Sequence, residues 1–80
     1  MKREIRNPDT ALEAYEAIQW NADAIGMSIW KLCKAADVHS PTVYRWQKNL
    51  RSYDIALYRA VMLKSFEIAD KMKRANKRGS

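Results

Sequence analysis

The chain contains little of what catalytic and metal-binding sites require. Its 80 residues include one Cys, one His, two Gly and two Pro. Cys33 belongs to a predicted helix core and His39 to a predicted turn, so they form neither a catalytic dyad nor a metal cluster. Gly26 and Gly79 are too far apart to build a phosphate-binding loop. We therefore expect no enzyme activity, no cofactor and no small-molecule ligand.

Features of secreted and membrane proteins are also missing. A single cysteine forms no disulfide framework, and the chain has neither a signal peptide nor an apolar run of about 18 residues. These absences predict a cytoplasmic protein with no membrane contact. The scarcity of Gly and Pro, together with the lack of alternating apolar residues, predicts an all-α fold.

What the chain has in excess is positive charge, with a net value of +6, and that charge is unevenly placed. Residues 7–27 contain four acidic residues and no basic one, whereas residues 28–51 contain five basic residues and one acidic residue. Residues 71–80 contain five basic residues and no acidic one. Such a separation of charge favours a polyanion that docks on one face of the protein.

The predicted architecture is a single compact domain of four helices, spanning residues 1–80. A basic arm covers residues 1–6, and the first helix begins near residues 7–9 and ends at Gly26. A central helix-turn-helix covers residues 28–49. A long C-terminal helix covers residues 53–74, and residues 75–80 form a basic tail.

Two short helical patterns lie next to each other in residues 28–49. The first begins at the N-cap Ser28, and the second begins at Ser40 with Pro41 as its first helical residue. The apolar positions of the two patterns fall on one face of each helix: Ile29, Leu32, Cys33 and Ala36, then Val43, Trp46 and Leu50. The opposite face of the second helix carries Pro41, Tyr44, Arg45 and Lys48. This arrangement is typical of a DNA recognition helix.

This segment resembles the helix-turn-helix of the Cro and phage-repressor family, also called XRE-type regulators. The buried positions of that family match Leu32, Ala36, Val38, Val43 and Trp46. The sequence departs from the family at three positions. Asp37 replaces the usual glycine of the turn, Cys33 replaces the usual alanine, and Ile29 replaces a glutamine that often contacts a phosphate.

The resemblance implies a sequence-specific transcriptional regulator, a small repressor of the phage or prophage type that acts in the bacterial nucleoid. Its partner would be double-stranded DNA, with the second helix in the major groove. Arg45 would read a guanine, with Tyr44, Thr42, Pro41 and Lys48 as further base contacts. The candidate backbone contacts are Ser40, His39, Lys31, Lys34, Trp30, Asn49 and Arg51. For His39 the alternative is an exposed turn residue without a role, and for Trp30 it is packing under the chain's own tail.

The long C-terminal helix carries more apolar residues than a small core needs. The surplus, formed by Ile55, Met62, Leu63 and Phe66, predicts a homodimer that reads a palindromic operator. The alternative is a fuller core layer against the first helix. Trp20, near the end of the first helix, is expected to lie half-buried against the last helix.

Two other functions remain open. The recognition helix also resembles those of excisionases and recombinase-type accessory proteins, but their winged forms need a β-hairpin where this chain continues as a helix. A protein-interaction module, such as an antitoxin or a phage inhibitor of a host factor, would instead use the acidic first helix and the surplus apolar face.

Overall fold

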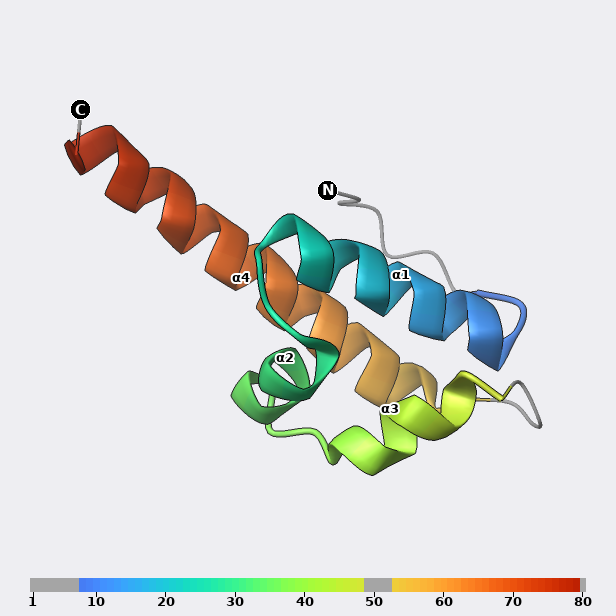
Figure 1. Cartoon of the computed structure of the whole chain (residues 1–80). Helices are drawn as coiled ribbons and strands as arrows, with labels where there is room; N and C mark the ends of the chain where they lie inside the picture. Colours follow the sequence, from blue (N-terminus) through green and yellow to red (C-terminus); the bar gives the residue numbers. More distant parts are fainter. Residues whose placement is uncertain (1–7, 49–52, 80) are drawn as a thin grey trace.

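The four helices predicted from the sequence are present. The computed structural model describes residues 8–48 and 53–79, the side chains of 76–79 excepted. The helices are α1 (Ala11–Ala24), α2 (Ile29–Ala35), α3 (Ser40–Trp46) and α4 (Ile55–Gly79), and the described ranges contain no strand. The prediction of an all-α fold is therefore confirmed (Figure 1). The predicted arm 1–6 and the candidate contacts Asn49 and Arg51 lie outside the described residues.

Helix α1 begins later than predicted because its start is fixed by two hydrogen bonds between side chains and the backbone. The Thr10 hydroxyl accepts a hydrogen bond from the Glu13 N–H at 3.1 Å. The Glu13 carboxylate in turn accepts one from the Asp9 N–H at 3.0 Å. This exchange resembles a capping box, which satisfies backbone donors that a helix start leaves free. The start therefore lies at Ala11 and not at residues 7–9.

Helix α4 also differs from the prediction at both ends. The Asp54 carboxylate accepts hydrogen bonds from the N–H groups of Ala56 and Leu57, so the helix begins at Ile55. At the other end it continues to Gly79, and the segment predicted as a tail, 75–79, is helical. No helix in the described ranges is both long enough and apolar enough to cross a membrane.

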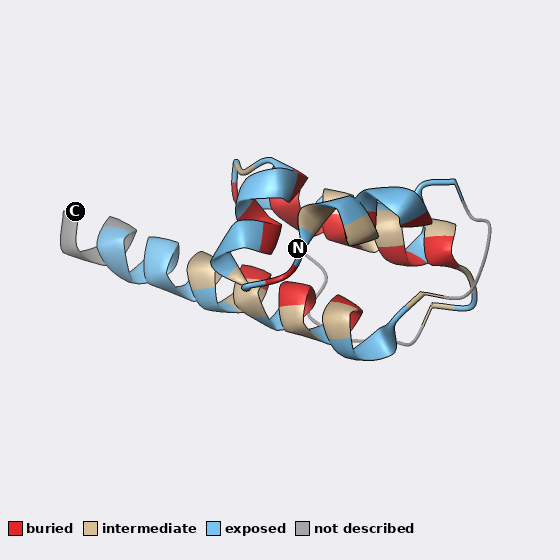
Figure 2. Cartoon of the chain, turned by 90° about the horizontal axis from the view of Figure 1, so that it is seen from below, coloured by how far each residue is buried: buried red, intermediate tan, exposed pale blue. Residues whose placement is uncertain are grey.

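Helices α1, α2 and α3 lie along one side of α4, and the C-terminal turns of α4 extend past them (Figure 2). The core forms where the apolar faces of the four helices meet. Its buried hydrophobic residues are Ala11, Ala14, Ile18, Ala22 and Ile25 from α1 and its end, Ile29, Leu32, Cys33 and Val38 from α2 and the turn, Val43 and Trp46 from α3, and Tyr58, Val61 and Met62 from α4.

Met62 was predicted to lie on a surplus apolar face, and that prediction is wrong. Its side chain is 1% exposed and belongs to the core of its own chain. The three other predicted interface residues remain accessible, because Ile55 and Leu63 are exposed and Phe66 is half-buried. Trp20 was expected to be half-buried against the last helix, but its side chain is 58% exposed.

A buried polar link connects α1 to α4. The Asn21 side-chain amide donates to the Ser65 hydroxyl at 3.1 Å and approaches the Met62 sulfur at 3.5 Å. The Ser65 hydroxyl donates to the Met62 carbonyl at 2.6 Å. A hydrogen bond between two fully buried side chains restricts how the helices slide against each other, because any shift leaves a polar group without its partner. This link fixes the position of α4 on α1.

Candidate nucleic-acid interface

Helix α2 presents a basic and aromatic outer surface because its inner face is held in the core. The Ser28 hydroxyl caps the helix by accepting a hydrogen bond from the Lys31 N–H at 3.1 Å, as predicted. Trp30 and Lys34 are exposed one turn apart on the outer surface. The Lys34 ammonium lies 4.9 Å from the centre of the Trp30 ring, a cation–π contact that orients both side chains. Trp30 remains 49% exposed.

The turn between α2 and α3 is a Schellman motif with an aspartate in the left-handed position. Asp37 has φ +58°, in the left-handed region that glycine adopts readily at helix ends. The Val38 N–H donates to the Cys33 carbonyl at 2.9 Å, and the Asp37 N–H donates to the Lys34 carbonyl at 3.2 Å. The prediction that Asp37 adopts the left-handed conformation is confirmed, and the turn fixes the direction in which α3 leaves α2.

Helix α3 begins one residue earlier than predicted. His39 is its N-cap and makes no side-chain capping hydrogen bond, so Ser40 is the first helical residue. Val43 and Trp46 are buried, as predicted. The Trp46 ring meets Tyr53 edge-on with 5.6 Å between the ring centres, and Tyr53 meets Tyr58 in the same way at 5.6 Å. This aromatic series anchors the C-terminal end of α3 to α4.

The residues predicted to read bases lie on the outer face of α3, except Lys48, which was predicted within the helix but lies two residues past its end at Trp46. Pro41, Tyr44, Arg45 and Lys48 are exposed. Thr42 is half-buried, so it is less accessible than the others. The centre of the Tyr44 ring lies 6.3 Å from that of Tyr15 on α1, which places Tyr44 at the border between α3 and α1. Burial, followed by the neighbouring Tyr44, raises the pKa of Tyr15.

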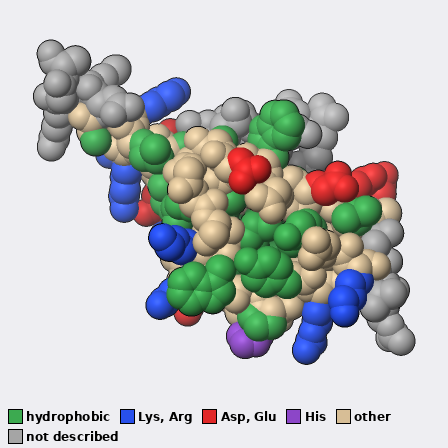
Figure 3. All heavy atoms as spheres, in the orientation of Figure 1, with side chains coloured by type: hydrophobic (Ala, Val, Ile, Leu, Met, Phe, Trp, Pro, Cys, Tyr) green, Lys and Arg blue, Asp and Glu red, His purple; other side chains and the backbone are tan. Residues whose placement is uncertain are grey.

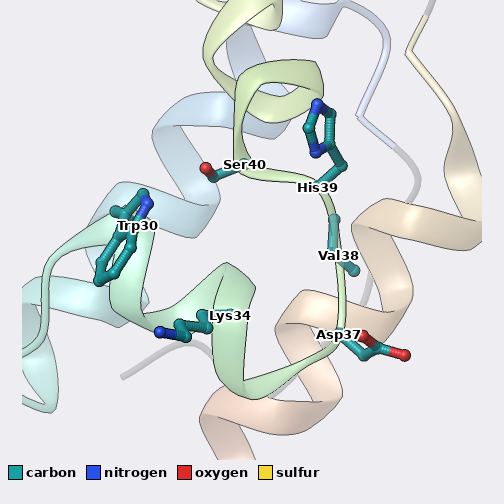
Figure 4. Close-up of a pocket in the computed structure, with 6 residues that line it drawn as sticks. All are labelled: Trp30, Lys34, Asp37, Val38, His39 and Ser40. Carbon is teal, nitrogen blue, oxygen red and sulfur yellow. The ribbon is translucent and has the colours of Figure 1, made fainter.

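A hollow of about 420 Å³ separates the outer surfaces of α2 and α3. Its lining residues are Trp30, Lys34, Asp37, Val38, His39 and Ser40. Figure 4 shows Trp30 and Lys34 on α2, with the Ser40 side chain at the start of α3 pointing toward the Trp30 side. Four of the predicted backbone contacts (Trp30, Lys34, His39 and Ser40) are thus brought to one place, and all four side chains can donate hydrogen bonds to an anionic backbone.

The charges of the described surface separate as the sequence predicted. In Figure 3, acidic side chains gather over α1, whereas Lys and Arg side chains flank a group of hydrophobic side chains over α2 and α3. Lys31 and Lys34 on α2, Arg45 on α3 and Lys48 just after α3 are all exposed. Asp37 is the acidic residue of the described stretch 28–48. The face formed by α2 and α3 is therefore suited to a polyanion.

Two tyrosines that position this face were missed in the sequence. Tyr15 supports Tyr44 from α1, and Tyr53 packs between Trp46 and Tyr58 while its hydroxyl donates to the Pro8 carbonyl at 2.6 Å. Burial raises the pKa of Tyr53, and the carboxylates of Asp9 and Glu13 raise it further. Residue spacing could not predict the contact between Pro8 and Tyr53, because the two residues lie 45 positions apart in the sequence.

Cys33 is fully buried, as its predicted core position implied. Burial raises the pKa of its thiol to about 11. The side chain is therefore a neutral part of the core at physiological pH. Across the described ranges, no three His, Cys, Asp or Glu side chains are grouped so that they could hold a metal ion.

Comparisons with protein-family models, curated proteins and solved structures gave no significant match. The function proposed below is therefore inferred from the geometry of α2, α3 and α4.

Proposed function

We propose that this chain is a sequence-specific DNA-binding transcriptional regulator that inserts α3 into the major groove. One observation carries the proposal. Helix α3 is fixed to the core by Val43 and Trp46. Its outer face exposes Arg45 and the turn after it exposes Lys48, with no acidic residue between Pro41 and Lys48. A rigid helix that presents cations and polar groups outward matches the width and charge of the major groove.

Within this proposal the exposed residues divide into two groups. Arg45 donates two hydrogen bonds to O6 and N7 of a guanine, which is the commonest specific contact in the major groove. Tyr44, Pro41 and Lys48 flank it, and Thr42 contributes from a half-buried position. The hollow between α2 and α3 faces the sugar-phosphate backbone, where Lys34, Ser40 and His39 hold the register of the protein on the duplex. Lys31 adds a further phosphate contact.

The regulator would act by occupying an operator and excluding the polymerase. Its resemblance to the Cro and phage-repressor family supports a repressor of the phage or prophage type in a bacterial cytoplasm. If two copies bind together, the operator is palindromic, with half-sites roughly 34–36 Å apart.

The test is selection of binding sites from random duplex DNA, followed by affinity measurements on a selected and an unrelated duplex. We expect Arg45→Ala to weaken the selected site by about 1–3 kcal/mol and the unrelated duplex by much less. Lys64→Ala is the matched control. It removes one positive charge from α4, where Lys64 pairs with Glu67 at 3.0 Å, and should preserve discrimination.

Two results would contradict the proposal. The first is a selection that enriches no common sequence. The second is an Arg45→Ala protein that distinguishes the two duplexes as well as the parent does. Measurements at two salt concentrations separate specific from purely electrostatic binding, since the electrostatic part falls steeply with salt.

A protein-interaction module is the second candidate, and the exposure of Trp20 favours it. This large side chain is 58% exposed on α1, where Glu13, Glu16 and Asp23 are exposed as well. An aromatic side chain surrounded by acids fits a basic partner protein. If Trp20→Ala leaves DNA binding unchanged while the parent binds DNA with no sequence preference, this second function is the better one.

A further inference from the structure

Trp30 exposes more of its ring than a contact with duplex DNA would cover. Its side chain remains exposed although the Lys34 ammonium lies over the ring, 4.9 Å from the ring centre. In duplex recognition the indole N–H can donate to a phosphate, and it is the single polar group of the side chain. The bases of a duplex are stacked on one another and leave no face free for the indole ring. Within a nucleic acid, an unpaired base is therefore the group that would cover this ring surface best.

The hollow between α2 and α3 gives such a base room beside the ring. Its volume of about 420 Å³ falls within the range of about 300–1,000 Å³ that is typical of sites for small organic ligands. Figure 4 shows Trp30, Lys34 and Ser40 around the hollow, whereas the carboxylate of Asp37 is directed away from Trp30 and Lys34. The hollow thus offers its contents an aromatic ring, a cation and a hydroxyl group.

Lys34 supplies the positive charge that a nucleotide needs next to its base. The cation–π contact holds the ammonium beside the ring, so a base stacked on Trp30 would carry its own phosphate toward Lys34. The Ser40 hydroxyl also lines the hollow and can donate a further hydrogen bond to that phosphate. The base and the phosphate of one nucleotide can therefore be bound at the same time.

The same face repeats this combination of ring and cation, which favours a strand over a free nucleotide. Tyr44 on α3 is exposed, and so is Arg45 next to it. In Figure 3 the hydrophobic side chains over α2 and α3 lie together, with Lys and Arg side chains around them. Proteins that bind single-stranded DNA have this arrangement, in which bases stack on aromatic rings and cations follow the backbone. Two exposed rings on one basic face therefore fit two nucleotides of one strand.

An exposed tryptophan alone does not make such a site, as Trp20 shows. Trp20 is more exposed than Trp30, but Glu16 and Asp23 lie one turn before and one turn after it on α1, and both are exposed. Acidic side chains repel a phosphate backbone, whereas Trp30 has Lys34 beside it. Charge therefore selects Trp30, and Trp20 provides a control.

We propose that the hollow between α2 and α3 binds an unpaired nucleotide of single-stranded DNA, with the base stacked on Trp30 and the phosphate on Lys34 and Ser40. Tyr44 stacks on a second base of the strand. This site would hold one strand where a duplex is opened. It rests on the proposed function only in placing DNA on this face, and it does not involve the reading of a base pair by Arg45.

The first experiment measures the affinity of the full chain for single-stranded oligothymidylate, by fluorescence anisotropy of the labelled oligonucleotide. Trp30→Ala should raise the dissociation constant about 5- to 150-fold, which is the usual effect of removing an aromatic ring that stacks on a base. Trp30→Phe keeps a ring and loses the indole N–H, so its affinity should be much closer to that of the parent. Trp20→Ala is the matched control and should bind like the parent.

The second experiment separates base stacking from attraction to the phosphate backbone. An abasic strand of the same length keeps every phosphate and lacks the bases, so the parent should bind it at least as weakly as Trp30→Ala binds oligothymidylate. Trp30→Ala and the parent should bind the abasic strand equally. Lys34→Gln should reduce the slope of log K against log salt concentration by about 0.7, the value for one phosphate contact of a single strand, and Trp30→Ala should leave that slope unchanged.

A parent that binds oligothymidylate and the abasic strand equally would overturn the proposal, because its binding would then need only phosphates. Parental affinity for oligothymidylate in a folded Trp30→Ala protein would overturn it as well. If Trp30→Ala is unfolded by circular dichroism, the parent's preference between the two strands decides. Should Arg45→Ala lose discrimination between duplexes while either contrary result is obtained, the proposed function stands and the site for an unpaired base does not.

Discussion

Gly26 and Asp37 adopt the left-handed backbone conformation, and substitutions at these two residues test the geometry of the turns directly. Each ends a helix in a Schellman motif, with φ +69° at Gly26 and φ +58° at Asp37. The Met27 N–H donates to the Ala22 carbonyl at 2.9 Å, just as the Val38 N–H donates to Cys33. The two turns share their geometry and differ in the residue that adopts it. Substitutions at the two positions should therefore have opposite effects on stability.

Gly26→Ala should destabilise the protein by about 1 kcal/mol. A Cβ at Gly26 meets nothing within 4 Å, so the effect is conformational and not steric. The left-handed conformation costs an L-residue roughly 1–2 kcal/mol, and the lower entropy of the unfolded alanine chain offsets about 0.4–1 kcal/mol of that. A change of 1 kcal/mol should lower Tm by about 4–8 °C in a domain of this size.

Asp37→Gly should have the opposite effect and stabilise the protein by about 0.5–1 kcal/mol. Glycine relieves the strain at φ +58°, and the change removes a negative charge from the C-terminal end of α2, where the helix dipole disfavours it. Asp37→Asn removes only the charge and should recover a few tenths of a kcal/mol. Thermal unfolding followed by circular dichroism, at one protein concentration, measures all three variants. If Asp37→Gly lowers Tm, or Gly26→Ala leaves it unchanged, the left-handed turns do not have the energetics argued for them.

Three further experiments test the core, the thiol and the basic end of α4. Met62→Asp should unfold the chain, whereas Leu63→Glu should leave its helical circular dichroism unchanged; an unchanged spectrum for Met62→Asp would contradict the packing. Cys33 should resist alkylation at pH 8, since its thiol pKa is about 11, and should react once denaturant unfolds the chain; rapid labelling of the native protein would show that the site is open. Deleting residues 73–80 should weaken binding to selected and unrelated DNA by similar factors. It should also reduce the slope of log K against log salt concentration by about 0.9 for each lost phosphate contact. An unchanged slope would show that these cations do not contact DNA.

Local patterns in the sequence were sufficient to predict the two short helices and the turn between them. Leu32, Val43 and Trp46 recur at helical spacing within one segment, and each is buried as predicted. The left-handed turn was also predictable, because Asp37 follows the end of one helical pattern and is one of the few residues that tolerate that conformation. These features depend on residues close together in the chain.

Features that depend on distant residues could not be predicted in this way. The periodicity of α4 shows a wide apolar face but not the angle at which the other helices meet it, so Met62 and Leu63 looked equivalent. The hydrogen bond from Asn21 to Ser65 spans 44 residues, and the contact of Tyr53 with Pro8 spans 45. One signal was available: Asn21 interrupts the apolar stripe of α1, and a polar residue at such a position indicates a buried partner.

Helix α4 combines three different surfaces because a helix of 25 residues turns about seven times and is longer than the core beside it. One side fills the core with Tyr58, Val61 and Met62, and another exposes Leu63. The C-terminal turns extend past the other helices (Figure 2), and Lys71, Lys73 and Arg74 are exposed there. Isolated helical turns are marginal in water, and here the carboxylate of Glu67 supports them by pairing with Lys64 at 3.0 Å and Lys71 at 3.4 Å. Those pairs lower the pKa of Glu67, chiefly through the hydrogen bond from Lys64. They are exposed and contribute little, so the projecting turns stay helical mainly because they continue a helix whose earlier turns are already packed in the core.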